Sequence, residues 1–136
     1  MDQSREKLKK TGLQITSNRI AKTWFTKGEK AKYFYLCSDA AKKTNLEAAD
    51  NALIAMKNWN NLKNLKNINN NTLIVWGDQD KSYNFEQVEV LNKNILNSEL
   101  KIFKGCSHNT HLEMPDKFNQ CIADFLLKKT ITTNSS

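Results

Sequence analysis

Two short stretches of the sequence carry side chains that could work together in proton transfer. Residues 71–80 end in Asp80, and residues 105–115 contain His108, which lies 28 positions further along the chain. An aspartate that hydrogen-bonds a histidine selects the tautomer of the imidazole and stabilises its protonated form, so that the histidine can act as a general base. This chemistry requires a fold that brings the two stretches side by side.

The apolar pattern from residue 72 onward predicts two strands and two helices in alternation. Residues 73–76 form a short, uninterrupted apolar run before Gly77, which is typical of a strand buried on both faces. Residues 100–103 (Leu-Lys-Ile-Phe), which are followed by Gly105, predict the second strand. The first helix is marked by Phe85, Val88, Leu91 and Ile95 after a capping pair, Asn84 and Gln87, and the second, which begins at Pro115, by Phe118, Cys121, Ile122, Phe125 and Leu126.

A helical connection between two neighbouring strands makes them parallel and places their carboxyl ends on the same edge of the sheet. Neighbouring strands lie about 4.8 Å apart. The loop after the first strand holds Asp78 and Asp80, and the loop after the second holds His108 and His111. The sequence therefore predicts that an acid and an imidazole meet at the rim where open α/β sheets bind ligands.

The two stretches resemble the acid loop and the histidine loop of the α/β-hydrolase family. Residues 71–80 (Asn-Thr-Leu-Ile-Val-Trp-Gly-Asp-Gln-Asp) look like its strand ending in Gly-x-x-Asp, and residues 105–115 (Gly-Cys-Ser-His-Asn-Thr-His-Leu-Glu-Met-Pro) look like its Gly-x-x-His loop. The resemblance implies that Asp80 is the triad acid and His108 the general base, with no metal and no organic cofactor. It implies an α/β fold class, the C-terminal β-α-β-α portion of an α/β-hydrolase fold preceded by cap-like helices.

The same resemblance leaves the nucleophile unaccounted for. In this family the chain order is nucleophile, acid, histidine, and the nucleophile sits in Gly-x-Ser-x-Gly between a strand and a helix. The four glycines, at positions 12, 28, 77 and 105, form no such motif. We therefore expect a fragment that is inactive alone, because the N-terminal half with its nucleophile (Ser, Cys or Asp) is missing.

The chain is expected to divide into three parts. Residues 1–70 are predicted to be helical and are similar to the cap or lid that many family members carry above the active site. A capping box at Thr44 begins one of these helices. Residues 71–129 form the C-terminal portion of the hydrolase core, and residues 130–136 are expected to be a disordered tail.

Other side chains near the predicted rim have less specific interpretations. Three side chains are candidates for lining a substrate pocket: Trp24, Phe25 and His111. The alternative for the two aromatic residues is packing in the core of the cap, and for His111 it is a structural role. Asp78 is expected to be a turn residue. Glu113 is expected to brace the histidine loop or the start of the following helix, where a negative charge is favourable.

The histidine loop also contains side chains of the types that bind metal ions, and a serine beside the proposed base. Cys106, His108, His111 and Glu113 resemble a metal cluster, but their spacing lacks the helical His-x-x-x-His register and the paired cysteines of common zinc sites. No metal is therefore predicted. Ser107 follows the last strand and directly adjoins the proposed base, which disfavours it as the nucleophile.

The composition is that of a globular chain, with 39% apolar and 26% charged residues and no apolar run long enough to span a bilayer. Three widely spaced cysteines and a polar start predict neither a disulfide framework nor a secretory signal, so the expected location is cytoplasmic. The net charge is +7. Residues 1–70 carry 14 basic and 6 acidic side chains, and the remainder 7 and 8. This diffuse excess argues against a nucleic-acid partner.

These features together predict a hydrolase that acts on an ester, lactone or related bond of a small-molecule substrate, with no membrane partner. The incomplete sheet predicts either a complementing N-terminal half or self-association. The alternatives are a non-catalytic split-gene product or protein-interaction module, and a basic nucleic-acid binder.

Overall fold

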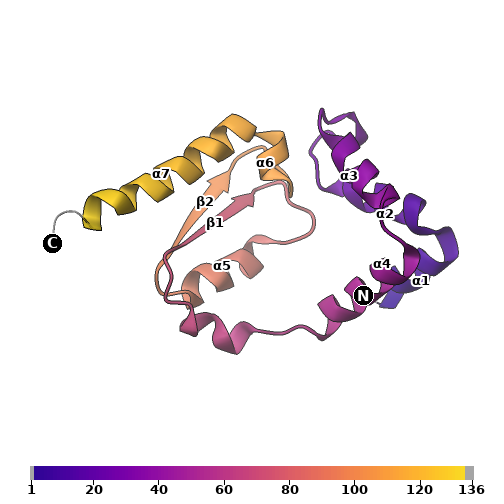
Figure 1. Ribbon diagram of the computed structural model, residues 1–136, viewed down its shortest axis with the longest axis horizontal. Helices are drawn as coiled ribbons and strands as arrows, with labels where there is room; N and C mark the ends of the chain where they lie inside the picture. The colour runs from indigo at the N-terminus through magenta and orange to yellow at the C-terminus, as the bar shows by residue number, and fades with distance from the viewer. Residues whose placement is uncertain (1, 134–136) are drawn as a thin grey trace.

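Figure 1 shows the computed structural model, which describes residues 2–133, with side chains through residue 128. A group of helices from the first half of the chain lies beside a small α/β unit formed by the rest. The helical part consists of α1 (Asp2–Thr11), α2 (Leu13–Thr23), the 3-10 helix η1 (Gly28–Lys30), α3 (Phe34–Lys42), α4 (Leu46–Asn58) and the 3-10 helix η2 (Leu62–Asn67). The α/β unit consists of β1 (Thr72–Gly77), α5 (Phe85–Asn94), β2 (Ser98–Phe103), α6 (Thr110–Glu113) and α7 (Pro115–Thr133).

The helices predicted in residues 1–70 are present and pack on one another. α2 packs against α3, and α1 packs against α2 and α4. The Arg5 guanidinium on α1 donates two hydrogen bonds, of 2.6 and 3.0 Å, to the Asp50 carboxylate on α4. These hydrogen bonds hold the pKa of Asp50 below its usual value. The buried side chains of Leu8 and Ala21 belong to the core of this part.

The helix α4 begins one residue later than the sequence predicts. Its capping residue is Asn45, whose side-chain oxygen accepts a hydrogen bond from the Ala48 N–H at 2.8 Å. The prediction of Thr44 as the cap is therefore wrong. Both residue types cap helices, but asparagine is preferred over threonine at the N-cap position. Of the two neighbouring residues, Asn45 is therefore the one that caps α4.

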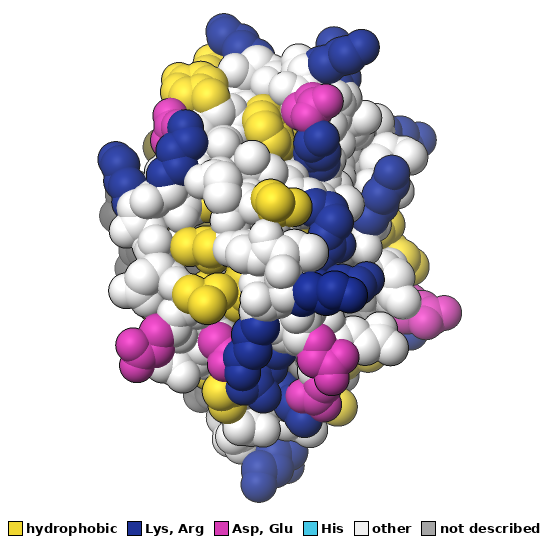
Figure 2. All heavy atoms as spheres, turned by 90° about the vertical axis from the view of Figure 1, so that its right-hand side faces the viewer, with side chains coloured by type: hydrophobic (Ala, Val, Ile, Leu, Met, Phe, Trp, Pro, Cys, Tyr) yellow, Lys and Arg dark blue, Asp and Glu magenta, His cyan; other side chains and the backbone are white. Residues whose placement is uncertain are grey.

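The basic side chains of the helical part are dispersed over its surface. Figure 2 shows one face with Lys and Arg side chains spread from top to bottom and with apolar and acidic side chains between them. Four acidic side chains of the helical part form ion pairs: Asp2 with Lys57, Glu29 with Lys22, Asp39 with Lys42, and Asp50 with Arg5. On the face shown in Figure 2, acidic and apolar side chains therefore lie among the basic ones.

The strands β1 and β2 are parallel neighbours, in register from the pair Thr72 and Ser98 onward. α5 connects them and begins with the predicted capping box, in which Asn84 and Gln87 each accept a hydrogen bond of 3.0 Å from the backbone N–H of the other. In Figure 1, α5 and α7 lie on opposite sides of the two strands. The predicted β-α-β-α order and the parallel pairing are confirmed.

The apolar faces of this two-stranded sheet are only partly covered. Leu73–Trp76 of β1 are half-buried, although their side chains are apolar on both faces of the strand. Ile102 of β2 is 44% exposed, and Leu126 and Leu127 of α7 are 59% and 61% exposed. Among the described residues, β1 has a neighbouring strand along one edge alone. The unit therefore presents an open strand edge and apolar surface to further polypeptide.

α7 continues through residue 133, which is four residues into the range for which the sequence predicts a tail. No Gly or Pro follows Pro115, so nothing interrupts the helical hydrogen bonds near residue 129. The predicted tail residues 134–136 lie outside the described residues. Neither α7 nor any other helix in residues 2–133 combines the length and apolar character needed to cross a bilayer.

The loops that follow β1 and β2 are joined by backbone hydrogen bonds. The Asp78 N–H donates to the Phe103 carbonyl at 3.1 Å, and the Gln79 N–H donates to the Cys106 carbonyl at 2.9 Å. Gly77 permits this approach, because a Cβ at that position would overlap backbone oxygen atoms of the second loop. The contact between the two loops thus depends on a glycine at the end of β1.

The substitution Gly77→Ala should therefore destabilise the chain. The added methyl group meets backbone atoms that cannot rotate away, and overpacking of this kind costs about 1–3 kcal/mol. Urea unfolding followed by tryptophan fluorescence, with a complementing N-terminal half present where the chain needs it for solubility, should show a lower midpoint. Lys81→Ala, an exposed change in the same loop, should alter the unfolding free energy by less than about 0.5 kcal/mol. Equal stability of Gly77→Ala and the unchanged protein would contradict this close approach.

Candidate active site

Asp80 lies just past the end of β1, in a turn that uses its own carboxylate as an acceptor. Its Oδ1 accepts hydrogen bonds from the N–H groups of Ser82 at 2.6 Å and Tyr83 at 3.3 Å. Its Oδ2 lies 2.9 Å from His108 Nδ1, and its side chain is 5% exposed. A shielded carboxylate that two backbone donors hold in place presents its second oxygen to the imidazole in a fixed direction.

The hydrogen bond predicted between the two loops is present, and it determines which nitrogen of His108 is free. An ionised carboxylate can only accept, so Nδ1 carries the proton and Nε2 presents its lone pair. Among the described residues Nε2 has no hydrogen-bond partner, and the histidine side chain is 29% exposed. Nε2 can therefore accept a proton from a group that approaches the rim of the sheet.

Two aromatic rings lie against the His108 imidazole. The Tyr83 ring is stacked on it, with 26° between the planes and 5.6 Å between the centroids, and the Trp24 ring lies 5.7 Å away at 34°. The Trp76 indole N–H donates to the Tyr83 carbonyl at 3.0 Å, which ties this loop to β1. Sequence reasoning identified Trp24 but missed Tyr83. The available signal was an aromatic residue three positions after Asp80, within reach of the turn that the aspartate makes.

Asp78, the other acid of this loop, has a different partner. Its Oδ1 accepts a hydrogen bond from the Gly105 N–H at 2.7 Å, which joins the start of one loop to the start of the other. Gly105 has a φ of 70°, in the left-handed region that favours glycine. These contacts agree with the interpretation of Asp78 as a turn residue.

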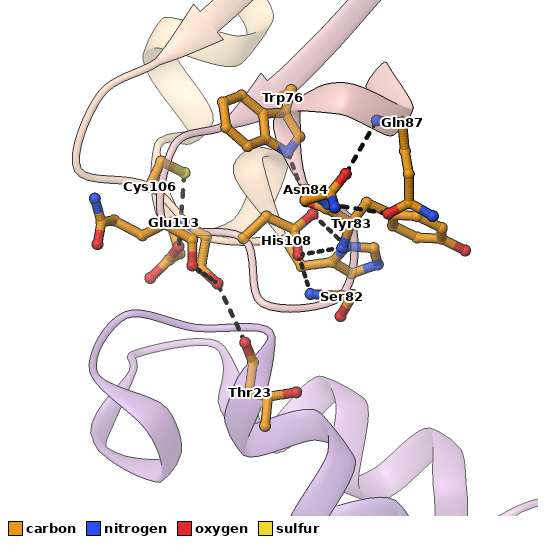
Figure 3. A network of polar contacts seen from close by, with 12 residues as sticks. Thr23, Trp76, Ser82, Tyr83, Asn84, Gln87, Cys106, His108 and Glu113 are labelled. Carbon is orange, nitrogen blue, oxygen red and sulfur yellow. Dashed lines mark hydrogen bonds and ion pairs between the residues drawn. The ribbon is translucent and has the colours of Figure 1, made fainter. Parts of the chain in front are cut away.

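The Glu113 carboxylate accepts hydrogen bonds from two segments that are distant from each other in the sequence. Its Oε1 accepts from the N–H and the hydroxyl of Thr26, each at 2.6 Å. Its Oε2 accepts from the Ser107 N–H at 2.6 Å and lies 3.6 Å from the Cys106 sulfur. Figure 3 shows Glu113 beside Cys106 and the loop that carries His108. The expectation that Glu113 braces the histidine loop agrees with these contacts.

Cys106 and Ser107 are buried and turned toward other partners. They are 0% and 1% exposed, respectively. Burial, followed by the charge of Glu113, raises the pKa of the Cys106 thiol to about 12, so the thiol is protonated at neutral pH. The Ser107 hydroxyl lies 3.2 Å from the carbonyl oxygens of Thr23 and Gln79, to which it can donate. Neither side chain is directed at His108 or at solvent.

The three candidate pocket residues occupy two different environments. Trp24 and His111 line an apolar cavity of about 680 Å³ in the helical part. The His111 ring also lies 5.9 Å from the Phe118 ring. Phe25, in contrast, is 4% exposed and meets the edge of Phe34 at 6.1 Å between centroids. The position of Phe25 fits packing in the core, the alternative to lining a substrate pocket.

A second cavity, of about 470 Å³, opens directly at the acid–base pair. Asp80 and His108 contribute to its lining, together with Trp59 from the end of α4 and apolar side chains of β1 and α5. Space is therefore available beside the imidazole for a reacting group that comes from elsewhere.

The side chains that resembled a metal cluster point to separate partners. In residues 2–133, no three or more His, Cys, Asp or Glu side chains are arranged to hold a metal ion. His108 faces Asp80. His111 borders the cavity of the helical part, whereas Cys106 and Glu113 contact each other.

The chain is similar in sequence and in structure to known proteins. No protein-family model matches the sequence. Monoacylglycerol lipase ABHD6 of Bos taurus is 33% identical over 73 residues, which are 54% of this chain and 22% of the lipase. The solved structure of an esterase from Exiguobacterium antarcticum matches with a TM-score of 0.83 at 22% identity, covering 91% of this chain and 46% of the esterase. An enol-lactonase from Burkholderia xenovorans LB400 matches with a TM-score of 0.81 at 19% identity, covering 91% of this chain and 48% of the lactonase.

The chain spans only a part of each of these proteins. It covers about half the length of the two solved structures, and the aligned segment is 22% of the lipase. The likeness to the solved structures confirms the predicted fold class, the C-terminal portion of an α/β-hydrolase fold preceded by helices. Sequence similarity to the lipase, the fold and the order of the acid and histidine loops all point to the α/β-hydrolase superfamily.

Proposed function

We propose that this chain carries the acid and the base of a hydrolase that cleaves an ester, lactone or related bond. The observation that supports the proposal is the 2.9 Å contact between Asp80 Oδ2 and His108 Nδ1 at the carboxyl edge of two parallel strands. In the proposal His108 is the general base, and Asp80 holds it in the tautomer that carries the proton on Nδ1.

The mechanism begins with a nucleophile that attacks the carbonyl carbon of the substrate and passes its proton to His108 Nε2. The Asp80 carboxylate stabilises the imidazolium, which then gives the proton to the leaving group. Water repeats the two steps on the covalent intermediate and releases the acid product. Because the Asp80 carboxylate already lies 2.9 Å from Nδ1, the imidazole need not reorient during proton transfer.

In this proposal the nucleophile and the oxyanion-stabilising donors come from polypeptide outside these 136 residues. The sequence contains no Gly-x-Ser-x-Gly, and Cys106 and Ser107 are buried. The open edge of β1 offers such polypeptide a strand to pair with, and the cavity beside His108 offers it a path to Nε2. The chain is then inactive alone.

The proposed substrate carries an apolar group that fits the cavity of about 680 Å³ in the helical part. Its apolar walls come from α2, α3, α4 and α6 and include Ile20, Ala21, Leu36, Ala40, Leu53, Met56 and Leu112. Trp24 borders both this cavity and the His108 imidazole, so a group held there would bring its reacting bond toward the base. The matched proteins are named as a monoacylglycerol lipase, an esterase and an enol-lactonase, which supports an ester-like bond.

A non-catalytic role as an interaction module is the second candidate. The observation that favours it is the exposed apolar surface around α7, where a groove of about 570 Å³ runs between β2 and α7. Leu127 lines this groove and is 61% exposed. Exposed apolar surface of this kind marks binding sites whether or not a reaction occurs.

Complementation distinguishes the two candidates. Co-expression with a matching N-terminal half that carries a nucleophile elbow should give a soluble complex that hydrolyses p-nitrophenyl esters. His108→Ala should abolish this activity, and Asp80→Asn should lower kcat on the order of 10⁴-fold because the imidazole loses its preferred tautomer. Asp116→Asn, an exposed change on α7, is the control and should retain activity. A soluble complex whose hydrolysis survives His108→Ala would refute the proposed base.

The chain purified alone should associate with itself and should not hydrolyse p-nitrophenyl esters faster than its His108→Ala variant. An open strand edge and uncovered apolar side chains favour association, and the electrostatic stabilisation that drives acyl transfer is lacking. Light scattering measures the first property and an absorbance assay the second. The proposal fails if the chain is a monomer that unfolds cooperatively with ~5–15 kcal/mol, or if its own turnover depends on His108.

Cys106 should resist alkylation by iodoacetamide at about pH 8, where a thiol with a pKa of about 12 remains protonated. Cys121 on α7 is only partly buried and borders the groove beside β2, so it should react faster and serves as the internal control. Peptide mass spectrometry measures both sites in one sample. Faster labelling at Cys106 than at Cys121 would be incompatible with the burial of Cys106 and would make it a candidate nucleophile.

A further inference from the structure

The end of α2 and the loop that carries His108 are joined by contacts that do not involve the sheet. The Asn109 N–H donates to the Trp24 carbonyl at 3.1 Å, and the Ser107 hydroxyl lies 3.2 Å from the Thr23 carbonyl. Figure 3 shows Thr23 facing this loop from the helical part. The residues on either side of His108 are therefore held by the helical part as well as by the sheet.

Glu113 completes this junction with both of its carboxylate oxygens. One oxygen accepts from the N–H and hydroxyl of Thr26, which is 87 positions away in the sequence, each at 2.6 Å. The other accepts from the Ser107 N–H, also at 2.6 Å. Hydrogen bonds to an ionised carboxylate are roughly twice as strong as those between neutral groups. Because Ser107 directly precedes His108, the carboxylate holds the backbone next to the proposed base.

We propose that Glu113 is a positioning residue for His108, which it couples to the helical part by holding Thr26 and Ser107 on one carboxylate. The inference rests on the proposed function for the role of His108 as the base. Glu113 does not touch the substrate in this proposal. It sets the backbone direction from which the imidazole reaches Asp80, so a ligand that displaces residues 23–26 would move the base with them.

The test observes the geometry of His108 directly rather than through catalysis. His108 and His111 are the two histidines of the sequence, so nitrogen NMR of labelled imidazole rings gives two separable signals, of which His111 is the internal reference. The sample is the chain in soluble form, with the complementing half where that half is needed for solubility. The unchanged protein should show His108 with its proton on Nδ1 and a Ser107 amide that exchanges slowly with solvent.

Two variants remove different parts of the junction. Glu113→Gln keeps the size of the side chain but replaces one acceptor oxygen with an NH₂ group, which must then face another donor. Exchange of the Ser107 amide should accelerate about tenfold, and the His108 signal should shift toward a mixture of tautomers. Thr26→Val removes one hydroxyl donor at nearly constant size and should cause smaller changes of the same kind. Asp116→Asn removes an exposed carboxylate three residues after Glu113 and should leave both signals unchanged.

An unchanged His108 signal and unchanged Ser107 exchange in Glu113→Gln would overturn the proposal, as would equal changes in Asp116→Asn. If Glu113→Gln instead unfolds, the His111 signal and the protection of the β1–β2 amides are lost together. In that case Thr26→Val decides the question, through the His108 signal and the exchange of the Ser107 amide. Failure of the proposed function can be distinguished from failure of the proposal for Glu113. A complex with His108 protonated on Nδ1 but with no hydrolysis would refute the proposed reaction and leave the role of Glu113 intact.

Discussion

Because β1 and β2 are parallel and in register, the loops that follow them leave the sheet side by side, and the rest of the site depends on this pairing. Gly77 lets the two loops touch, since any side chain there would strike the second loop. The Asp80 carboxylate, held by two backbone N–H groups, then reaches His108 at 2.9 Å. Without the pairing, an acid and an imidazole 28 residues apart would have no fixed relation.

The His108 imidazole is contacted from two parts of the chain, the α/β unit and the helical part. Asp80 and the stacked Tyr83 come from the loop after β1, whereas Trp24 comes from the end of α2. Glu113 links the segment after α2 to the loop that carries His108, through charge-assisted hydrogen bonds from Thr26 and Ser107. The same unit leaves apolar side chains of β2 and α7 exposed and one edge of β1 open among the described residues. The proposed function accounts for both features, the hydrogen-bonded acid–base pair and the incompletely covered sheet beside it.

The strands and the crossover helix could be predicted from local patterns, and the meeting of an acid and an imidazole at one rim from the geometry of parallel strands. The choice of Asp80 and His108 came from the resemblance of their loops to those of the α/β-hydrolase family. The cap of α4 was misplaced at Thr44, since two adjacent residues can both cap a helix and their difference is small. The stacking of Tyr83 and the partner of Glu113 in the helical part depend on tertiary packing. A single sequence carries no signal for a contact between side chains 87 residues apart.

The central claim is that this chain supplies the base while another polypeptide segment supplies the nucleophile. Mass spectrometry of the complemented assembly, denatured during turnover of an activated ester, measures this most directly, because it locates the acyl group of the covalent intermediate. We expect the acyl group on the complementing half, and we expect it to be absent when His108 is replaced by alanine. An acyl group on this chain itself, at Ser107 or Cys106, would contradict the account.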